Sequence, residues 1–262
     1  MDLIVDGKKV FAATGGQDFD PQKPALLFLH GAGCDRTTWR LQTRYFAYHG
    51  RSVLAVDLPG HGRSAGQPLA TIAEMAEWVM RLLDAAKLKS AALIGHSMGA
   101  LIALQAAATH PDRVWALGLL GVAQSMPVHP ELLAAARAHQ HKCMELMANW
   151  GIGRPLQMGG MKSPGLWLTG EVLRVTEHAL PGSIGTDMAA CVDYGDASIA
   201  AKQVRCPTMF VLGELDMMTP PANARALAAA VEGSETSLIA GAGHFMMVER
   251  PDQTLDALKE IV

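Results

Sequence analysis

The chain has 262 residues and a mass of 27.9 kDa, which fits one large domain or one domain that carries an insertion. Hydrophobic residues make up 50% of it and charged residues 18%, so a disordered chain is excluded. The 22 basic and 25 acidic residues leave a net charge of −3. No basic face or stripe is visible, so binding through nucleic-acid phosphates is not expected.

The sequence contains no candidate for a membrane-spanning helix. Its longest unbroken apolar run covers residues 114–123, whereas a span needs roughly 18 apolar residues. Residues 1–6 show neither the basic nor the long apolar region of a secretory signal, so we expect a cytoplasmic protein. The four cysteines form no C-x-x-C pair, which favours free thiols over a zinc or redox site.

The first half of the chain alternates short apolar runs with segments of helical spacing, the pattern of a mostly parallel sheet covered by helices. An opening hairpin is expected at residues 3–5 and 9–13. Near-continuous apolar runs, typical of strands buried on both faces, follow at residues 25–29, 52–56, 91–94 and 114–120. Helices are expected between them at residues 35–48, 71–86 and 98–109. The pattern ends with a strand at 208–212, a helix at 222–231, a strand at 236–239 and a helix at 251–261.

The stretch from about residue 122 to residue 202 differs in character, because it is rich in Met, His, Gly and Pro and shows no convincing strand. Helical segments are expected near residues 131–150 and 170–178. We interpret this stretch as a helical cap that is inserted after the sixth strand and lies over the carboxyl ends of the sheet. The alternative is ordinary helical covering of the sheet. The predicted division is a core of residues 1–123 and 203–262 with a cap of residues 124–202.

The strongest chemical signal is the segment Gly95-His-Ser-Met-Gly99, which follows an apolar strand and opens a helix. Ser97 is expected on a sharp, strained turn that holds its hydroxyl clear of the sheet. Glycine is needed at positions 95 and 99 because side chains there would collide with the neighbouring strand and helix. Ser97 is therefore the candidate nucleophile.

A serine nucleophile needs a histidine base and an acid that orients the histidine. Of the ten histidines, His244 fits best, because it lies in a glycine-rich loop directly after the last predicted strand. His96, inside the turn, is expected to pack or to form hydrogen bonds locally. The acid should follow a strand between the serine and the histidine. Asp216 meets that requirement after the strand at residues 208–212, and Glu214 is the nearest rival.

Acyl transfer also places negative charge on an oxygen, which two backbone N–H groups can stabilise. The turn itself supplies the N–H of Met98. The second donor is expected from the segment His30-Gly-Ala-Gly33, which leaves the strand at residues 25–29. Within it, Ala32 is the predicted donor.

These motifs resemble the α/β-hydrolase superfamily over essentially the whole chain. The segment Asp57-Leu-Pro-Gly-His-Gly-Arg-Ser64 is similar to the turn that many members carry after their fourth strand, where Asp57 and Arg63 are expected to form local hydrogen bonds. The resemblance implies an eight-stranded, mostly parallel sheet with helices on both faces and a cap after the sixth strand. The serine motif is most similar to those of small bacterial esterases and lactonases. Ser97 argues against dehalogenases and epoxide hydrolases, which use Asp there, and Ala32 makes a haloperoxidase-like activity a minor alternative.

The distribution of methionine suggests an apolar, adaptable substrate pocket. Five of the fourteen methionines after Met1 flank the proposed catalytic residues and six lie in the cap, namely Met98, Met217, Met218, Met246 and Met247, and Met126, Met144, Met147, Met158, Met161 and Met188. Generic core filling is the alternative interpretation. Trp150 and Trp167 either line the pocket or only pack the cap against the core.

The sequence thus predicts a serine hydrolase that cleaves a carboxylic ester or lactone with an apolar portion, so its partner is a small-molecule substrate. No cofactor is expected. No metal is expected either, because His139 and His141 lie two residues apart on a predicted helix and point away from each other. Two alternatives stay open: a carbon–carbon bond hydrolase or lyase with the same residues, and a ligand-binding receptor built on a slow hydrolase.

Overall fold

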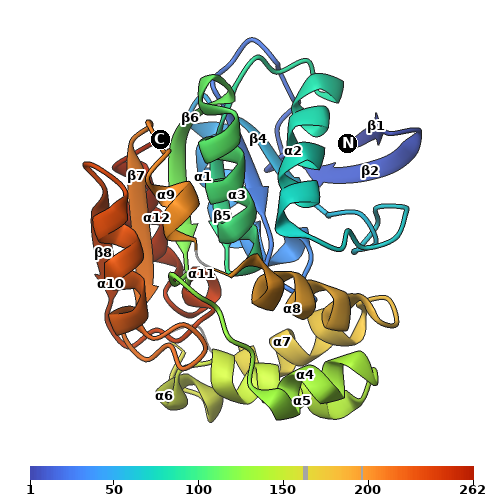
Figure 1. Ribbon diagram of the computed structural model, residues 1–262, viewed down its shortest axis with the longest axis vertical. Helices are drawn as coiled ribbons and strands as arrows, with labels where there is room; N and C mark the ends of the chain where they lie inside the picture. Colours follow the sequence, from blue (N-terminus) through green and yellow to red (C-terminus); the bar gives the residue numbers. More distant parts are fainter. Residues whose placement is uncertain (162–164, 196) are drawn as a thin grey trace.

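The computed structural model describes residues 1–161, 165–195 and 197–262. In it, eight strands form one sheet in the order β1-β2-β4-β3-β5-β6-β7-β8 (Figure 1). The first two strands pair antiparallel and β2 pairs antiparallel with β4, whereas all later neighbours are parallel. The strands are β1 (Asp2–Val5), β2 (Lys8–Ala13), β3 (Ala25–Leu29), β4 (Ser52–Val56), β5 (Ala91–His96), β6 (Val114–Leu120), β7 (Thr208–Gly213) and β8 (Glu235–Ile239). The mostly parallel sheet confirms the predicted fold class.

Helices cover both faces of this sheet, as predicted for strands that are apolar throughout. On one face lie α2 (Ile72–Ala85), α3 (Met98–Thr109), α9 (Ser198–Ala201) and α10 (Pro221–Ala230). On the other lie the 3-10 turn η1 (Arg36–Trp39), α1 (Arg40–Tyr48), α11 (Met246–Glu249) and α12 (Pro251–Lys259). A second 3-10 turn, η2 (Pro111–Arg113), leads into β6.

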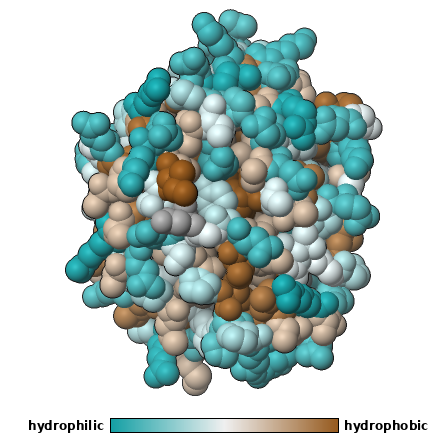
Figure 2. All heavy atoms as spheres, viewed as in Figure 1, coloured by the Kyte–Doolittle hydropathy of each residue, from teal (hydrophilic) through white to brown (hydrophobic). Residues whose placement is uncertain are grey.

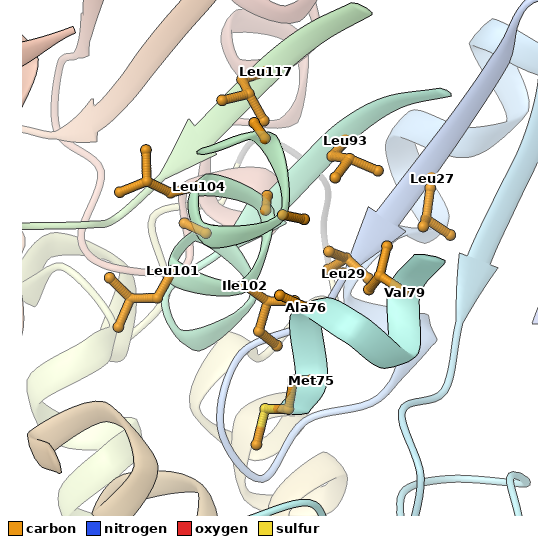
Figure 3. Packing of buried hydrophobic residues seen from close by; sticks show 14 of the residues in the cluster. Leu27, Leu29, Met75, Ala76, Val79, Leu93, Leu101, Ile102, Leu104 and Leu117 are labelled. Carbon is orange, nitrogen blue, oxygen red and sulfur yellow. The ribbon is translucent and has the colours of Figure 1, made fainter. Parts of the chain in front are cut away.

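Alternate residues of each central strand enter two separate cores. In β3, Leu27 and Leu29 face α2 and α3, whereas Leu26 and Phe28 face the opposite layer. Figure 3 shows the first of these cores, where leucines of three strands meet Met75 and its neighbours on the helices. Burial of apolar surface on both faces holds the sheet and its helices together, because each Å² that is removed from water contributes about 25 cal/mol of stabilising free energy. It also fixes the edge at which the loops after the parallel strands meet.

A helical stretch follows β6, as predicted, and its helices gather at the end of the sheet where the parallel strands finish (Figure 1). It contains α4 (Pro130–Arg137), α5 (His141–Gly151), α6 (Arg154–Gln157), α7 (Leu168–Glu177) and α8 (Ser183–Tyr194). The helical segment expected near residues 131–150 consists of two helices, because the chain breaks at His139, whose φ is +50°. Helix α8 was not predicted at all. The core and cap boundaries at 123/124 and 202/203 stay a prediction.

Figure 2 shows mainly hydrophilic side chains on one face, with hydrophobic side chains in small, separate groups. Among the described residues, no helix combines the length and the hydropathy that crossing a bilayer demands.

Candidate active site

Ser97 lies at the carboxyl end of β5 in the strained turn that the sequence predicted. Its backbone has φ +54° and ψ −117°, a conformation that residues other than glycine rarely adopt. The glycines on either side permit it: a Cβ on Gly95 would lie 2.1 Å from the Gly99 oxygen, and one on Gly99 would lie 2.3 Å from the Leu29 oxygen. The N–H of Ser97 donates to the Leu120 oxygen of β6 at 2.8 Å. The turn is therefore fixed between two strands.

His244 and Asp216 come together beside this turn, although 28 residues separate them in the sequence. The His244 Nδ1 atom lies 2.8 Å from the Asp216 Oδ2 atom, and both side chains are almost fully buried. Asp216 follows β7 and His244 follows β8, so the parallel order of these strands brings the two loops to one edge. A carboxylate in this contact fixes the imidazole tautomer and stabilises the imidazolium.

Three further hydrogen bonds hold Asp216. The backbone N–H groups of Met218 and Thr219 donate to its Oδ1 atom, each at 2.8 Å, and the Thr219 hydroxyl donates to its Oδ2 atom at 2.7 Å. Thr219 is a site residue that the sequence reasoning missed, and its place three residues after the acid is the signal that could have found it. Glu214, the rival acid, accepts from the Gly241 N–H instead and has no described contact with His244.

His96 does more than pack locally, which corrects the prediction made for it. Its Nε2 atom donates to the His244 carbonyl oxygen at 2.9 Å, so it links the serine turn to the histidine loop. The two rings lie 4.6 Å apart. Burial and the neighbouring His244 ring hold the pKa of His96 well below its ordinary value, so the ring is neutral. Its buried Nδ1 atom has no hydrogen-bond partner among the described residues.

A second buried carboxylate, Glu249 of α11, accepts hydrogen bonds from the loop that carries His244. Its Oε2 atom accepts from the N–H groups of Gly243 and Gly153, at 2.8 and 2.9 Å, and its Oε1 atom accepts from Phe245 at 3.0 Å. Burial raises the pKa of Glu249, although the three N–H groups act in the opposite direction. His244 thus sits between two residues whose backbone is fixed by one side chain. No motif in the sequence indicated this role for Glu249.

The two predicted oxyanion donors come from different segments near Ser97. Ala32 lines the same pocket as Ser97, and Met98 follows the serine directly as the first residue of α3. Within the part of the chain that the structure describes, no acceptor from another element bonds to the N–H of Ala32 or of Met98. Both groups are therefore available to a developing negative charge.

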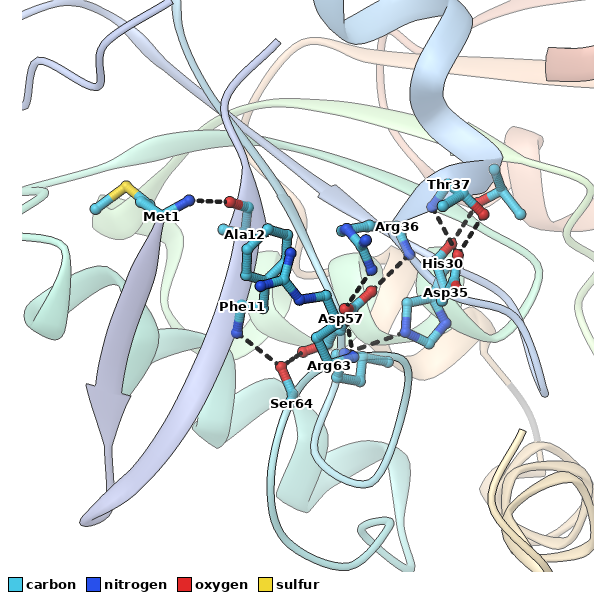
Figure 4. A network of polar contacts seen from close by, with 12 residues as sticks. Met1, Phe11, Ala12, His30, Asp35, Arg36, Thr37, Asp57, Arg63 and Ser64 are labelled. Atoms are coloured by element: carbon cyan, nitrogen blue, oxygen red, sulfur yellow. Dashed lines mark hydrogen bonds and ion pairs between the residues drawn. The ribbon is translucent and has the colours of Figure 1, made fainter. Parts of the chain in front are cut away.

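Asp57 anchors the loop region behind the oxyanion donors, as the sequence predicted for local hydrogen bonds. Its buried carboxylate accepts from the Arg36 N–H at 2.9 Å, the Arg36 guanidinium at 2.7 Å and the Arg63 N–H at 2.8 Å (Figure 4). Gly62 makes this approach possible, because a Cβ there would lie 2.4 Å from the Asp57 carboxylate. The Ser64 hydroxyl donates to the Asp57 carbonyl oxygen, which closes the turn. This network is structural and does not reach the pocket.

A cavity of about 130 Å³ opens above Ser97 and His244. Its walls are mostly apolar and come from both the sheet loops and the inserted helices: Val128, Leu132, Trp150, Phe245 and the five methionines Met126, Met147, Met188, Met217 and Met218. The methionine hypothesis holds for these five of the eleven. Met158 is 97% exposed, and Trp167 is 63% exposed, so neither lines the cavity.

The fold agrees with what comparison with other proteins shows. Residues 26–257 match the model of the alpha/beta hydrolase family. The chain belongs to that family.

One curated protein and two solved structures are among those similar to this chain. A pimeloyl-[acyl-carrier protein] methyl ester esterase of Yersinia pseudotuberculosis is 29% identical over 244 residues, which cover 87% of this chain and 88% of the esterase. The enol-lactonase of Burkholderia xenovorans LB400 has the same fold with a TM-score of 0.86, at 22% identity over 100% of this chain and 99% of the lactonase. Est816, described as an N-acyl homoserine lactone degrading enzyme, has a TM-score of 0.82 and 26% identity, and all of each chain is covered.

Proposed function

We propose that this chain is a serine hydrolase that cleaves a carboxylic ester or lactone with an apolar portion through an acyl-enzyme. The observation that carries the proposal is the Asp216–His244 contact at the floor of an apolar cavity, beside a serine held in a strained turn. No metal or redox cofactor takes part in this chemistry.

Ser97 is the nucleophile and His244 the base. The His244 Nδ1 atom is committed to Asp216, so the Nε2 atom accepts the proton as the Ser97 oxygen bonds to the substrate carbonyl carbon. The electron pair of the carbonyl moves to its oxygen, and the N–H groups of Ala32 and Met98 stabilise this oxyanion. When the tetrahedral intermediate collapses, the leaving alcohol takes the proton from His244.

The second half of the reaction repeats these roles with water. His244 removes a proton from water, the hydroxide attacks the acyl carbon, and the departing Ser97 oxygen regains a proton from His244. In a lactone the leaving alcohol stays attached to the acyl group, so the product is a single hydroxy acid.

The cavity supports a small apolar substrate group rather than a large charged one. Its wall carries leucine, valine, tryptophan and methionine side chains, and no arginine or lysine lines it among the described residues. Apolar walls with a few placed polar groups are typical of small-molecule sites. An ester substrate in one relative and lactone substrates in two structural neighbours support this class.

Labelling with a fluorophosphonate, together with a panel of nitrophenyl esters of increasing acyl length and a series of lactones, tests the proposal. The wild-type chain is expected to be labelled once and to hydrolyse short and medium acyl esters. Ser97→Ala should lose both properties. Ser90→Ala is the matched control, because Ser90 precedes β5 at its other end and should keep both.

Two results contradict this function. Ester hydrolysis that persists in Ser97→Ala would contradict the role of Ser97 as nucleophile. A wild-type chain that is neither labelled nor active would contradict the hydrolase function itself. Activity on ring-fission dienes or cyanohydrins without any on esters or lactones replaces the substrate class with the carbon–carbon alternative.

A further inference from the structure

Helix α8 carries a buried carboxylate, Asp187, that lies outside the proposed catalytic set. The side chain is fully buried, and its Oδ2 atom accepts from the Gly33 N–H at 2.8 Å. The same oxygen lies 2.8 Å from the His61 Nε2 atom. The Oδ1 atom has no partner among the described residues. A buried carboxylate with one unpaired oxygen is costly to keep, so its contacts invite a functional explanation.

The surroundings of His61 favour its charged form. Its Nδ1 atom lies 3.0 Å from the Pro59 carbonyl oxygen and its Nε2 atom faces Asp187, and since both partners only accept, both ring nitrogens carry protons. Burial by itself lowers the pKa of His61, but Asp187 raises it above the ordinary value. The other titratable groups that face His61 are His30, whose ring lies 5.0 Å away, and Asp57.

The peptide between Gly31 and Ala32 is fixed from the core side. The Gly31 oxygen accepts from the Cys34 N–H at 3.1 Å and from the His30 Nδ1–H at 2.9 Å. The Leu58 N–H donates to the other ring nitrogen of His30, which leaves the ring proton on Nδ1. A trans peptide directs its N–H opposite to its C=O. Bonds to the Gly31 oxygen therefore hold the peptide of the Ala32 N–H, the proposed oxyanion donor, from one side.

The next peptide, between Ala32 and Gly33, is fixed from the inserted segment. Its N–H is the group that donates to Asp187. Gly33 adopts φ +64°, and a Cβ there would lie 2.8 Å from a side-chain carbon of Ile184, also on α8. Helix α8 thus touches this loop through one apolar and one polar side chain.

We infer that Asp187 is a positioning residue for the oxyanion hole: from helix α8, and held by His61, it fixes the Gly33 peptide and thereby the Ala32 N–H. The inference rests on the proposed function. It assigns to the inserted helices a part in transition-state stabilisation in addition to their part in shaping the pocket. Asp187 touches no substrate, so its effect is transmitted entirely through the loop.

Asp187→Asn and Asp187→Ala test this inference against Asp193→Asn, which alters an exposed carboxylate on the same helix. Steady-state kinetics with the best nitrophenyl ester are normalised to the sites titrated by the fluorophosphonate. The affinity for a trifluoromethyl ketone, which forms an oxyanion on the serine, is measured alongside. Melting temperatures establish that each variant is folded at the assay temperature.

Both Asp187 variants are expected to lose about 10- to 100-fold in kcat, less than the 100- to 1,000-fold typical of a deleted donor, with KM changed less than threefold. The affinity for the trifluoromethyl ketone should fall by the same factor as kcat/KM. Asp193→Asn should match the wild type. An unchanged kcat and ketone affinity in folded Asp187→Asn overturns the inference, as does a loss confined to KM. A wild-type chain without ester activity instead refutes the proposed function.

Discussion

On the acid–base side of the site, the buried carboxylate of Glu249 belongs to the core and accepts only neutral backbone N–H groups. On the serine side, the buried carboxylate of Asp187 belongs to an inserted helix and faces a charged imidazole. The first binds Gly243 and Phe245, its neighbours in sequence, and Gly153, which lies 96 residues away, and the second reaches a loop 154 residues away. Both sides are therefore tied to the inserted stretch, since the His244 N–H also donates to the Gly151 oxygen at 2.6 Å, but only the oxyanion loop is held by a carboxylate that is paired with an imidazole.

Close backbone contacts at glycines occur on both sides of the site. On each, glycines let two chain segments meet more closely than side chains permit: Gly95 against Gly99 on the serine side, and Gly213 against Gly243 on the acid–base side, where a Cβ would lie 2.0 Å from the Gly243 oxygen. Close backbone contacts thus hold both sides of the site, and the two buried carboxylates add hydrogen bonds to the loops. Substitutions on each side should show how much the side chains contribute beyond these backbone contacts.

The largest effect is expected from Asp216→Asn. Because asparagine cannot hold the His244 tautomer or stabilise the imidazolium as a carboxylate does, kcat should fall about 10⁴-fold. Steady-state kinetics with a nitrophenyl ester measures this loss. Glu214→Gln is the control and should lose less than tenfold, since Glu214 contacts the Gly241 N–H instead. If the two variants exchange these effects, the acid on this side is Glu214.

Glu249→Gln should destabilise the fold. A glutamine offers one acceptor oxygen, so its amide N–H₂ must face at least one of the N–H groups that the carboxylate now satisfies. Leaving such a buried donor unpaired costs about 1–3 kcal/mol, and urea unfolding at pH 7 should show a loss of about 2 kcal/mol. Glu145→Gln, on the exposed face of α5, should unfold like the wild type. An unchanged midpoint for Glu249→Gln would show that the acid–base side does not depend on this carboxylate.

A smaller effect is expected at Thr219. Thr219→Val removes the hydroxyl that donates to Asp216 and keeps the branched shape, so kcat should fall about tenfold, in line with about 1.5 kcal/mol for a hydrogen bond to a charged group. Thr219→Ser retains the hydroxyl and should recover most of the activity. The kcat of both variants with the same ester decides the matter. Equal losses in both would assign the role of Thr219 to packing.

The sequence predicted those parts whose pattern follows directly from burial. The runs at β3, β4 and β6 are almost entirely apolar, because both faces of these strands are covered, and their boundaries agree residue for residue. Ser97, Asp216 and His244 were found because each follows a strand, and the structure brings Asp216 to His244 and places Ser97 and His244 in one pocket. Their catalytic roles remain part of the proposal.

Helix α8, Glu249 and Asp187 were missed for the same physical reason. A helix shows itself in sequence through an apolar stripe, but the buried side of α8 includes Ser183, Gly185 and Asp187. A buried polar residue looks like a surface residue until its partner is known. Those partners lie 96 and 154 residues away for Gly153–Glu249 and Gly33–Asp187, so no local pattern reveals them.

The smallest effect, and the one that separates the two carboxylates most directly, is a pH dependence of stability on the serine side. The pKa of His61 is raised in the folded chain by Asp187, against the effect of burial, so the pair contributes stability that is fully present below about pH 6.5 and is lost as the pH rises through the folded value. The difference in unfolding free energy between the wild type and Asp187→Asn should therefore be largest near pH 5.5 and shrink toward pH 8.5.

Urea unfolding at several pH values measures this difference, with Asp193→Asn as a control that should run parallel to the wild type. His30 and Asp57 also face His61, but both are present in every variant, so their effect cancels unless it depends on Asp187. A difference that stays constant with pH, or that grows as the pH rises, would mean that His61 is neutral in the folded chain. The oxyanion loop would then be held by the Gly33 hydrogen bond alone, and the two sides of the site would be anchored alike.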